Sequence, residues 1–503
     1  GVLVGIIDTG IDYLNKEFQR EDDTTRIVRI WDQTIQGNKE IYSLKYGTEY
    51  TEDQINQAIR LQASGGDPYS IVPSKDDIGH GTRMAGIIGG RGINPDLKGA
   101  ASDCQFIIVK LSRATKVELD VAVIDKTDVP SYSPWSALLA LRYIIAVARE
   151  LKRPVVVFEP LGSNMGSHTG NGIVEQSINN YSTQSGTVVV VPTGNQGNTD
   201  THTEGIIENV GDVKDIEIRI GEKQRNLPIE IWINKPNRIK LSIISPSGEM
   251  IDNLDSKNAN NERIKFLYEG TEMIVNFTSP ELSTGDSHIF IRAYNLKAGI
   301  WKFRLTGQYI VEGKYYAWIP QRELLDSETK FLNSVGYTTL TLSSTSNRAI
   351  SVAYYNQEDN SVVTESGRGY TRDKMIKPDI AAGGFNAIVT NPGGGTAVIS
   401  GASVAGAVVA GCCVLILQWA VTDKNYPDIY AEQIKAYIIS GAKGRPGDVY
   451  PNKEWGYGML DMNGIFDRIK DTYNPRKSED YEEYRVNNLF IRIPKSRYNR
   501  TIN

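Results

Sequence analysis

Three short segments of the sequence carry a carboxylate, an imidazole and a hydroxyl, in that order along the chain. Asp8 stands in VGIIDTGID, His80 in GHGT and Ser403 in SGASVAG. A serine hydroxyl becomes a nucleophile when a histidine accepts its proton, and an aspartate holds that imidazole in the productive tautomer. The order Asp, His, Ser is one of the orders in which such triads occur. The sequence therefore predicts acyl transfer through a serine nucleophile.

Each segment has a simpler interpretation when it is taken alone. Asp8-Thr9-Gly10 is also the triplet of aspartic proteases, but those need a second catalytic aspartate, and the sequence has no second Asp-Thr/Ser-Gly triplet. His80 between two glycines fits a loop that begins a helix. Ser403 fits a helix N-cap, although a helix N-terminus is also where the dipole favours an oxyanion. The combination of the three segments is what indicates catalysis.

The elements that would position these residues alternate between strands and helices in the first third of the chain. β-branched runs predict strands at 2–7, 106–111, 155–158 and 187–191, and amphipathic patterns predict helices at 134–151 and 172–185. This alternation is typical of an α/β fold with a parallel sheet that helices cover on both faces. Asp8 would follow the first strand, at the carboxyl edge where such sheets bind ligands.

The pattern changes between residues 213 and 319. Short alternating runs such as DIEIRI, LPIEIWI and HIFIRAY are separated by turn residues, which predicts an inserted β-sandwich or jelly-roll domain. The predicted domains are therefore a catalytic domain in two parts, 1–212 and 320–475, the insertion 213–319, and a tail 476–503. The insertion either stiffens the catalytic domain or recognises a substrate or partner.

Composition excludes several other classes of protein. The 503 residues include 55 basic and 60 acidic ones, a net charge of −5, so the chain lacks the excess of positive charge typical of nucleic-acid binding. Three cysteines without a CxxC pair argue against a disulfide framework and a cysteine zinc site. We find no EF-hand loop and predict no metal and no cofactor. The uncharged stretch 399–421 is long enough to span a membrane, but its many small residues favour a buried helix and no transmembrane segment.

The three segments resemble the signatures of the subtilisin-like serine peptidases, the subtilases of peptidase family S8. This resemblance implies that Ser403 is the nucleophile, His80 the general base and Asp8 the residue that orients it. VPTGNQG resembles the family segment with the oxyanion-hole asparagine, which implies that role for Asn195. Pro160-Leu161-Gly162 resembles the family's substrate-binding strand, which implies substrate contacts for Pro160, Leu161 and Gly162. The resemblance also implies substrate contacts for Thr193 and Gly194 of VPTGNQG.

Several positions depart from the family pattern. Ala402 stands where threonine is most common, Arg83-Met84 where His-Val is frequent, and Asn15-Lys16 where His-Pro is frequent. These departures leave open a second hypothesis, a catalytically impaired binding or signalling protein on a subtilase scaffold. Of the other histidines, His168 either contacts substrate or lies in a solvated loop.

An insertion between Asn195 and Ser403, together with SGRGYTRD at 366–373, is similar to the clostridial Csp proteases. Members of that group act in spore germination by cleaving the precursor of a cortex-lytic enzyme. The resemblance implies a protein or peptide substrate and a spore-associated or extracellular location in a bacterium; a general secreted subtilase is the alternative. Because the chain begins directly with a predicted strand, we expect a leader or propeptide upstream, and a cleaved propeptide is a candidate partner.

Overall fold

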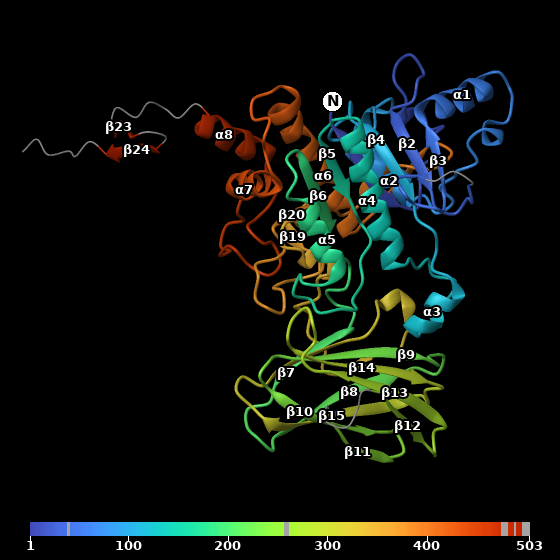
Figure 1. Ribbon diagram of the computed structural model, residues 1–503, viewed down its shortest axis with the longest axis vertical. Helices are drawn as coiled ribbons and strands as arrows, with labels where there is room; N and C mark the ends of the chain where they lie inside the picture. Colours follow the sequence, from blue (N-terminus) through green and yellow to red (C-terminus); the bar gives the residue numbers. More distant parts are fainter. Residues whose placement is uncertain (38–40, 256–260, 474–480, 487–488, 495–503) are drawn as a thin grey trace, which may run out of the picture.

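The computed structural model describes residues 1–37, 41–255, 261–473, 481–486 and 489–494. Figure 1 shows an α/β body that contains the N-terminus and, below it, a body made of antiparallel strands, with α3 beside the junction. The predicted fold class, an α/β fold interrupted by an inserted β domain, is confirmed.

The α/β body is built on one largely parallel sheet. Its strands follow the order β19-β18-β6-β5-β1-β4-β2-β3, with β20 paired to β18, and only the β2–β3 and β18–β19 pairs are antiparallel. β1 lies between β4 and β5, so the strand order reverses there, which is where α/β sheets place their ligands. The strands are β1 Leu3–Asp8, β2 Ile27–Asp32, β3 Thr48–Thr51, β4 Gln105–Lys110, β5 Val155–Phe158, β6 Thr187–Pro192, β18 Ile350–Asn356, β19 Ser361–Val362 and β20 Ile380–Gly383.

Helices cover both faces of this sheet and create two separate cores. One core joins the sheet to α2 and α6, and the other joins it to α4 and α5. The helix that runs from Ala402 to Thr422 is long and apolar enough to cross a membrane, yet its apolar stretch is mostly buried against the sheet. The helices are α1 Glu52–Ala63, α2 His80–Gly89, α3 Lys116–Ala122, α4 Pro134–Glu150, α5 Ile173–Tyr181, α6 Ala402–Leu417, α7 Ala431–Gly441 and α8 Met462–Tyr473.

The β domain consists of two sheets that enclose one apolar core. Their strand orders are β11-β10-β15-β8-β17 and β12-β13-β14-β9-β16-β7. β7 and β17 lie outside the range 213–319, and both pair with strands inside it. The strands are β7 His202–Ile206, β8 Val213–Ile220, β9 Leu227–Ile233, β10 Arg238–Ile244, β11 Met250–Leu254, β12 Glu262–Phe266, β13 Thr271–Thr278, β14 Ser287–Tyr294, β15 Gly299–Tyr309, β16 Lys314–Trp318 and β17 Lys330–Phe331.

Three short elements complete the parts of the chain that matter for the site. A 3₁₀ turn, η4 (Arg322–Leu324), follows the return from the β domain, and a second, η5 (Leu342–Thr345), precedes β18. A hairpin of β21 (Ala387–Thr390) and β22 (Thr396–Ile399) leads into α6. Of the predicted tail 476–503, the structure describes β23 (Tyr481–Val486) and β24 (Leu489–Pro494), which pair with each other; its remaining residues lie outside the described ranges.

Candidate active site

Asp8 is the last residue of β1, and the alternation of that strand decides which face its side chain points to. Val4 and Ile6 belong to the core beneath α2 and α6, whereas Leu3 and Ile7 belong to the core beneath α4. Since side chains alternate along a strand, Asp8 shares the face of Val4 and Ile6. Its carboxylate is therefore buried on the side from which α2 and α6 approach.

His80 is the first residue of α2 and binds this carboxylate directly. Its Nδ1 lies 2.7 Å from Oδ2 and 2.9 Å from Oδ1 of Asp8. Gly79 before it has a φ of 85°, a left-handed conformation that costs glycine little. Because a carboxylate only accepts, Nδ1 donates, and Nε2 is left as the acceptor.

Two opposing effects act on the His80 imidazole. Burial alone would lower its pKa, but the charge of Asp8 and the hydrogen bond to it outweigh burial, so that the pKa of His80 is raised above its usual 6.5. The His80 side chain is still 31% exposed, while that of Asp8 is fully buried. The pair therefore combines a sheltered negative charge with an accessible ring that is ready to hold a proton.

A second buried carboxylate, Asp76, organises the loop that carries the imidazole. Its Oδ1 accepts from Thr9 Oγ1 and from the Gly79 N–H, both at 2.7 Å. Its Oδ2 accepts from the N–H and hydroxyl of Thr82, at 2.8 and 2.7 Å. Thr9 in turn accepts from the Gly81 N–H at 3.0 Å. Sequence reasoning missed Asp76; the only signal was an acidic residue just before GHGT.

Asn195 follows β6 and ties that strand to the start of α6. Its Oδ1 accepts from the Ala402 N–H at 3.0 Å. This bond identifies the oxygen side of the amide, and Nδ2 lies 3.5 Å from the position of a Cβ atom on Gly401, the residue before α6. Asn195 is exposed, and its donor is therefore within reach of an added ligand.

Ser403 lies in the first turn of α6, and the packing of α2 against α6 relates it to His80. Both helices begin at the carboxyl edge of the sheet. They touch again further along, where the Ile88 carbonyl lies 3.3 Å from the position of a Cβ atom on Gly411. His80 and Ser403 each precede that contact by eight residues. The two side chains thus occupy equivalent places at the beginning of neighbouring helices.

The residues predicted to contact substrate form two segments that continue β5 and β6, and we call them the first edge segment (160–162) and the second edge segment (193–196). Thr341 lies between them. A Cβ atom on Gly162 would be 2.5 Å from Thr341 Cβ, and one on Gly194 would be 2.3 Å from Thr341 Cγ2. Thr341 also donates its N–H to the Thr193 carbonyl at 3.0 Å. The structure thus brings both segments together on one side chain that the sequence did not single out.

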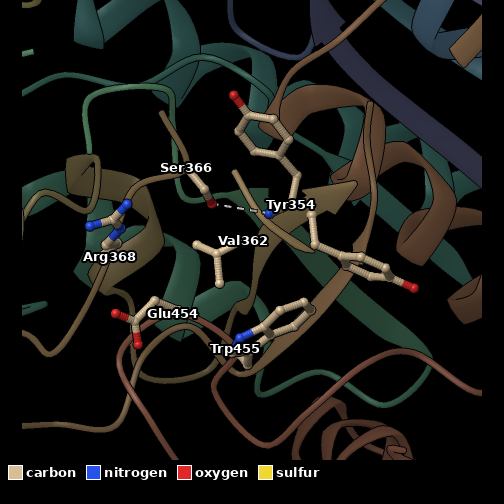
Figure 2. Close-up of a pocket in the computed structure, with 7 residues that line it drawn as sticks. Tyr354, Val362, Ser366, Arg368, Glu454 and Trp455 are labelled. Carbon is tan, nitrogen blue, oxygen red and sulfur yellow. Dashed lines mark hydrogen bonds between the residues drawn. The ribbon is translucent and has the colours of Figure 1, made fainter. Parts of the chain in front are cut away.

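The segment SGRGYTRD packs directly behind the second edge segment. The Gly367 N–H donates to the Gly194 carbonyl at 2.9 Å. The neighbouring Ser366 hydroxyl accepts from the Tyr354 N–H at 3.1 Å, the dashed line in Figure 2. Figure 2 also shows Arg368 and Trp455 around a small hollow beside this segment. The segment is therefore a support for the backbone that precedes Asn195.

Two of the departures from the family pattern meet on the β21–β22 hairpin. Arg83 Nε and Nη2 donate to Asn391 Oδ1 at 3.1 and 2.8 Å. Asn15 Nδ2 donates to Thr390 Oγ1 at 2.9 Å. The third departure, Ala402, is buried. The unusual residues thus fasten the hairpin that leads to Ser403, and none of them contacts the Asp8–His80 pair through a hydrogen bond described in the structure.

His168 is not a solvated loop residue, and that interpretation is wrong. It is 1% exposed and stacks on Trp318 of β16 with ring centroids 4.1 Å apart. Its Nε2 lies 2.8 Å from the Asn164 carbonyl. The ring belongs to the junction between the two bodies, because Trp318 comes from the β domain. Within the described ranges, no group of three or more His, Cys, Asp or Glu side chains could hold a metal ion.

A family model described as the subtilase family matches residues 1–217 and 331–458, which is more than half of the chain. The chain belongs to the subtilase family. Its α/β body is accordingly that of a subtilisin-like serine protease, and the unmatched stretch between the two parts falls in the β domain.

Among solved structures, this subtilase is similar to the Clostridium perfringens CspB protease, with a TM-score of 0.83 and 29% sequence identity over 94% of each chain. Among curated proteins it is 23% identical over 490 residues to the PII-type proteinase of Lacticaseibacillus paracasei, which covers 88% of this chain and 24% of that protein. The PIII-type proteinase of Lactococcus lactis subsp. cremoris is 22% identical over 508 residues, with 88% and 23% covered. The chain therefore spans about a quarter of the length of these curated relatives.

Proposed function

We propose that this subtilase is a serine endopeptidase that cleaves a protein substrate through an acyl-enzyme, with Asp8, His80 and Ser403 as its triad. The observation that carries the proposal is the Asp8–His80 pair, in which Nδ1 lies 2.7 Å from a buried carboxylate oxygen. A structural histidine needs no accessible ring edge, whereas a general base must reach the proton that it removes and needs a neighbour that stabilises the imidazolium it forms, as the Asp8 carboxylate would.

The proposed reaction follows from the protons that each residue holds. His80 Nε2 removes the proton from Ser403 as its oxygen attacks the scissile carbonyl, and later gives that proton to the leaving amine. Asp8 stabilises the imidazolium that exists between those steps. Asn195 Nδ2 and the backbone N–H of Ser403 donate to the oxyanion, and one such side-chain donor is worth about 10²–10³ in rate in this type of site.

We also propose that the substrate lies as an extended chain along the two edge segments. The support is the backbone of the first edge segment, which continues β5 beyond its last pair with β6 and could pair with an added strand. The Thr193 and Gly194 carbonyls of the second edge segment already accept from the Thr341 and Gly367 N–H groups, so this segment would bound the site rather than pair with the substrate. In this arrangement Pro160, Leu161 and Gly162 line one side, Thr193 and Gly194 line the other, and Thr341 forms the floor. The proposed domain division, 1–212 with 320–475 around 213–319, places both segments in the catalytic domain.

For the biological role we propose activation of a spore cortex-lytic proenzyme during germination. The similarity to the CspB protease over 94% of both chains supports it, as does the resemblance of the inserted domain and of SGRGYTRD to the Csp group. A cleaved propeptide is the proposed second partner. Mixing the protein with such a proenzyme should produce one defined cut, and a proenzyme that stays intact contradicts this role.

The serine chemistry is tested with a fluorophosphonate probe on the full chain. We expect wild type to be labelled and Ser403→Ala to be unlabelled, because only an activated serine reacts. Ser400→Ala is the matched control, since Ser400 is exposed three residues away and its hydroxyl accepts from the Asn386 N–H. That variant should label like wild type. Folded wild type that resists the probe would instead support a catalytically impaired subtilase.

A further inference from the structure

The connection from β16 to β17 of the β domain crosses between the two edge segments. We call residues 321–324, which comprise Gln321 and the turn η4, the strap. It follows β16 directly, and the Ile319 N–H just before it donates to the Thr201 carbonyl. The position of the strap is therefore set by β16 and by the chain that enters β7, two paired strands of the β domain.

The strap occupies a backbone acceptor of the first edge segment. Gln321 Nε2 donates to the Gly162 carbonyl oxygen at 2.6 Å. Gly162 is exposed, and its carbonyl is the kind of group that an added strand uses for main-chain hydrogen bonds. A side-chain amide therefore takes the place that the N–H of an extended peptide would take.

Two contacts hold the strap on the second edge segment. The Arg322 N–H donates to Gln196 Oε1 at 3.0 Å, and Gln196 Nε2 donates to the Glu323 carboxylate at 3.1 Å. Gln196 is buried and follows Asn195 directly. Lys126, in the loop after α3, adds a bond from Nζ to the Glu323 carbonyl at 3.0 Å. The strap thus joins both edge segments and the α3 loop.

We propose that the strap is a gate over the non-prime side of the substrate site, and that an extended substrate binds by displacing Gln321 from Gly162. This inference rests on the substrate placement proposed above. Only the Gln321 bond has to break, since the Arg322 and Glu323 contacts involve no atom of the first edge segment. The β domain thereby acts on substrate access, because its strand β16 leads into the strap.

The test compares a long and a short substrate on the full chain. Gln321→Ala removes the competing donor, and Gln321→Glu keeps the length of the side chain but can no longer donate. With a tetrapeptide anilide that runs along the first edge segment, we expect KM to fall by about threefold to tenfold in both variants, the effect of one neutral hydrogen bond. With a single-residue acyl ester, which does not reach Gly162, KM and kcat should stay at the wild-type values.

Gln176→Ala is the matched control, because Gln176 on α5 also donates a side-chain N–H to a loop carbonyl, that of Asn171. It should leave both substrates unaffected. An unchanged or raised KM for the tetrapeptide in both Gln321 variants would overturn the gate. Fluorophosphonate labelling of each variant reports on Ser403 separately, so a failure of the gate can be told apart from a failure of the proposed catalytic function.

Discussion

His80 and His168 both lie inside the protein, yet their surroundings push their proton affinities in opposite directions. His80 faces the Asp8 carboxylate, and its pKa is raised. His168 stacks on Trp318 in the junction between the two bodies, where burial lowers its pKa to about 3, with His202 and Arg372 adding to the effect. A buried imidazole thus becomes a proton acceptor only where a negative charge accompanies it.

The junction around His168 is held by stacked rings and one buried cation. Trp318 also stacks on His202 at 4.4 Å, and on the neighbouring strands Trp232 stacks on His288 at 4.0 Å. Arg372 lies over Trp232 at 4.9 Å and pairs with Asp286 at 2.7 Å. Here histidine serves as a flat ring that stacks on tryptophan.

The largest expected effect comes from removing the imidazole that has a carboxylate partner. His80→Ala should lower kcat by about 10⁴–10⁶-fold and Asp8→Asn by about 10⁴-fold, since members of a triad act as a unit. Steady-state kinetics with a peptide anilide measure both. The matched change His168→Phe should alter kcat by less than about threefold; a loss as large as that of His80→Ala would place His168 in the reaction.

The next effect concerns the buried cation at the junction. Arg372→Met leaves Asp286 without its partner, and we expect the free energy of unfolding to fall by about 3–5 kcal/mol, as in other broken buried pairs. Urea unfolding followed by tryptophan fluorescence measures it. Arg304→Met is the control, because its pair with Asp215 at 2.8 Å is more exposed and should cost less than about 1 kcal/mol. Equal losses of unfolding free energy in the two variants would mean that burial does not increase the cost of breaking the Arg372–Asp286 pair.

The third effect appears as a dependence of stability on pH. Because the folded pKa of His168, about 3, lies below the unfolded value of 6.5, the unfolded chain binds a proton that the folded chain refuses between those values. Stability is therefore lost as the pH falls below 6.5, by up to about 1.4 kcal/mol per pH unit. His168→Phe keeps a ring against Trp318 and should flatten this slope by about that amount in urea titrations at pH 4–6.5.

His80 makes stability depend on pH in the opposite direction. Its raised folded pKa adds stability that is fully present below pH 6.5 and is lost as the pH rises through the folded value. His80→Ala should therefore weaken the pH dependence of the free energy of unfolding above pH 6.5 and leave it unchanged below pH 6.5. If His80→Ala and His168→Phe altered stability over the same range of pH, the pKa values of the two histidines would not be shifted in opposite directions.

Much of the fold could be predicted because local patterns and burial agree. β5 and β6 are continuous β-branched runs, and each was expected within one residue of its observed bounds. β11 and β12 were not predicted, since MIDNL and ERIKF show no strict alternation of polar and apolar residues and are largely exposed at the edges of their sheets. β7 was missed for a related reason, because HTEGI carries no apolar alternation and is a strand only through its pairing with β16.

The site was predictable where one segment carries its own chemistry, as Asp8 and His80 do. Thr341 and Gln321 were not predictable, because their partners are far away in the sequence. Asp76 binds Gly79 and Thr82 nearby as well as the distant Thr9, and an aspartate ahead of a turn does not by itself indicate that network. Thr341, for example, is 179 residues from Gly162, and only the fold brings the two residues into contact beside the site. The environment of His168 depends likewise on a tryptophan from another domain.

The hydrogen bond between Asn195 and Ala402 also has a consequence for how the chain folds. It joins residues 207 positions apart, and closing so long a loop is entropically costly. The pairing of His202 with Trp318, once formed, removes more than half of those positions from the loop that remains to be closed. A β domain that folds first would shorten the remaining closure and lower its cost by about 0.7 kcal/mol. Earlier folding of the insertion would then assist formation of the contact between Asn195 and the start of α6.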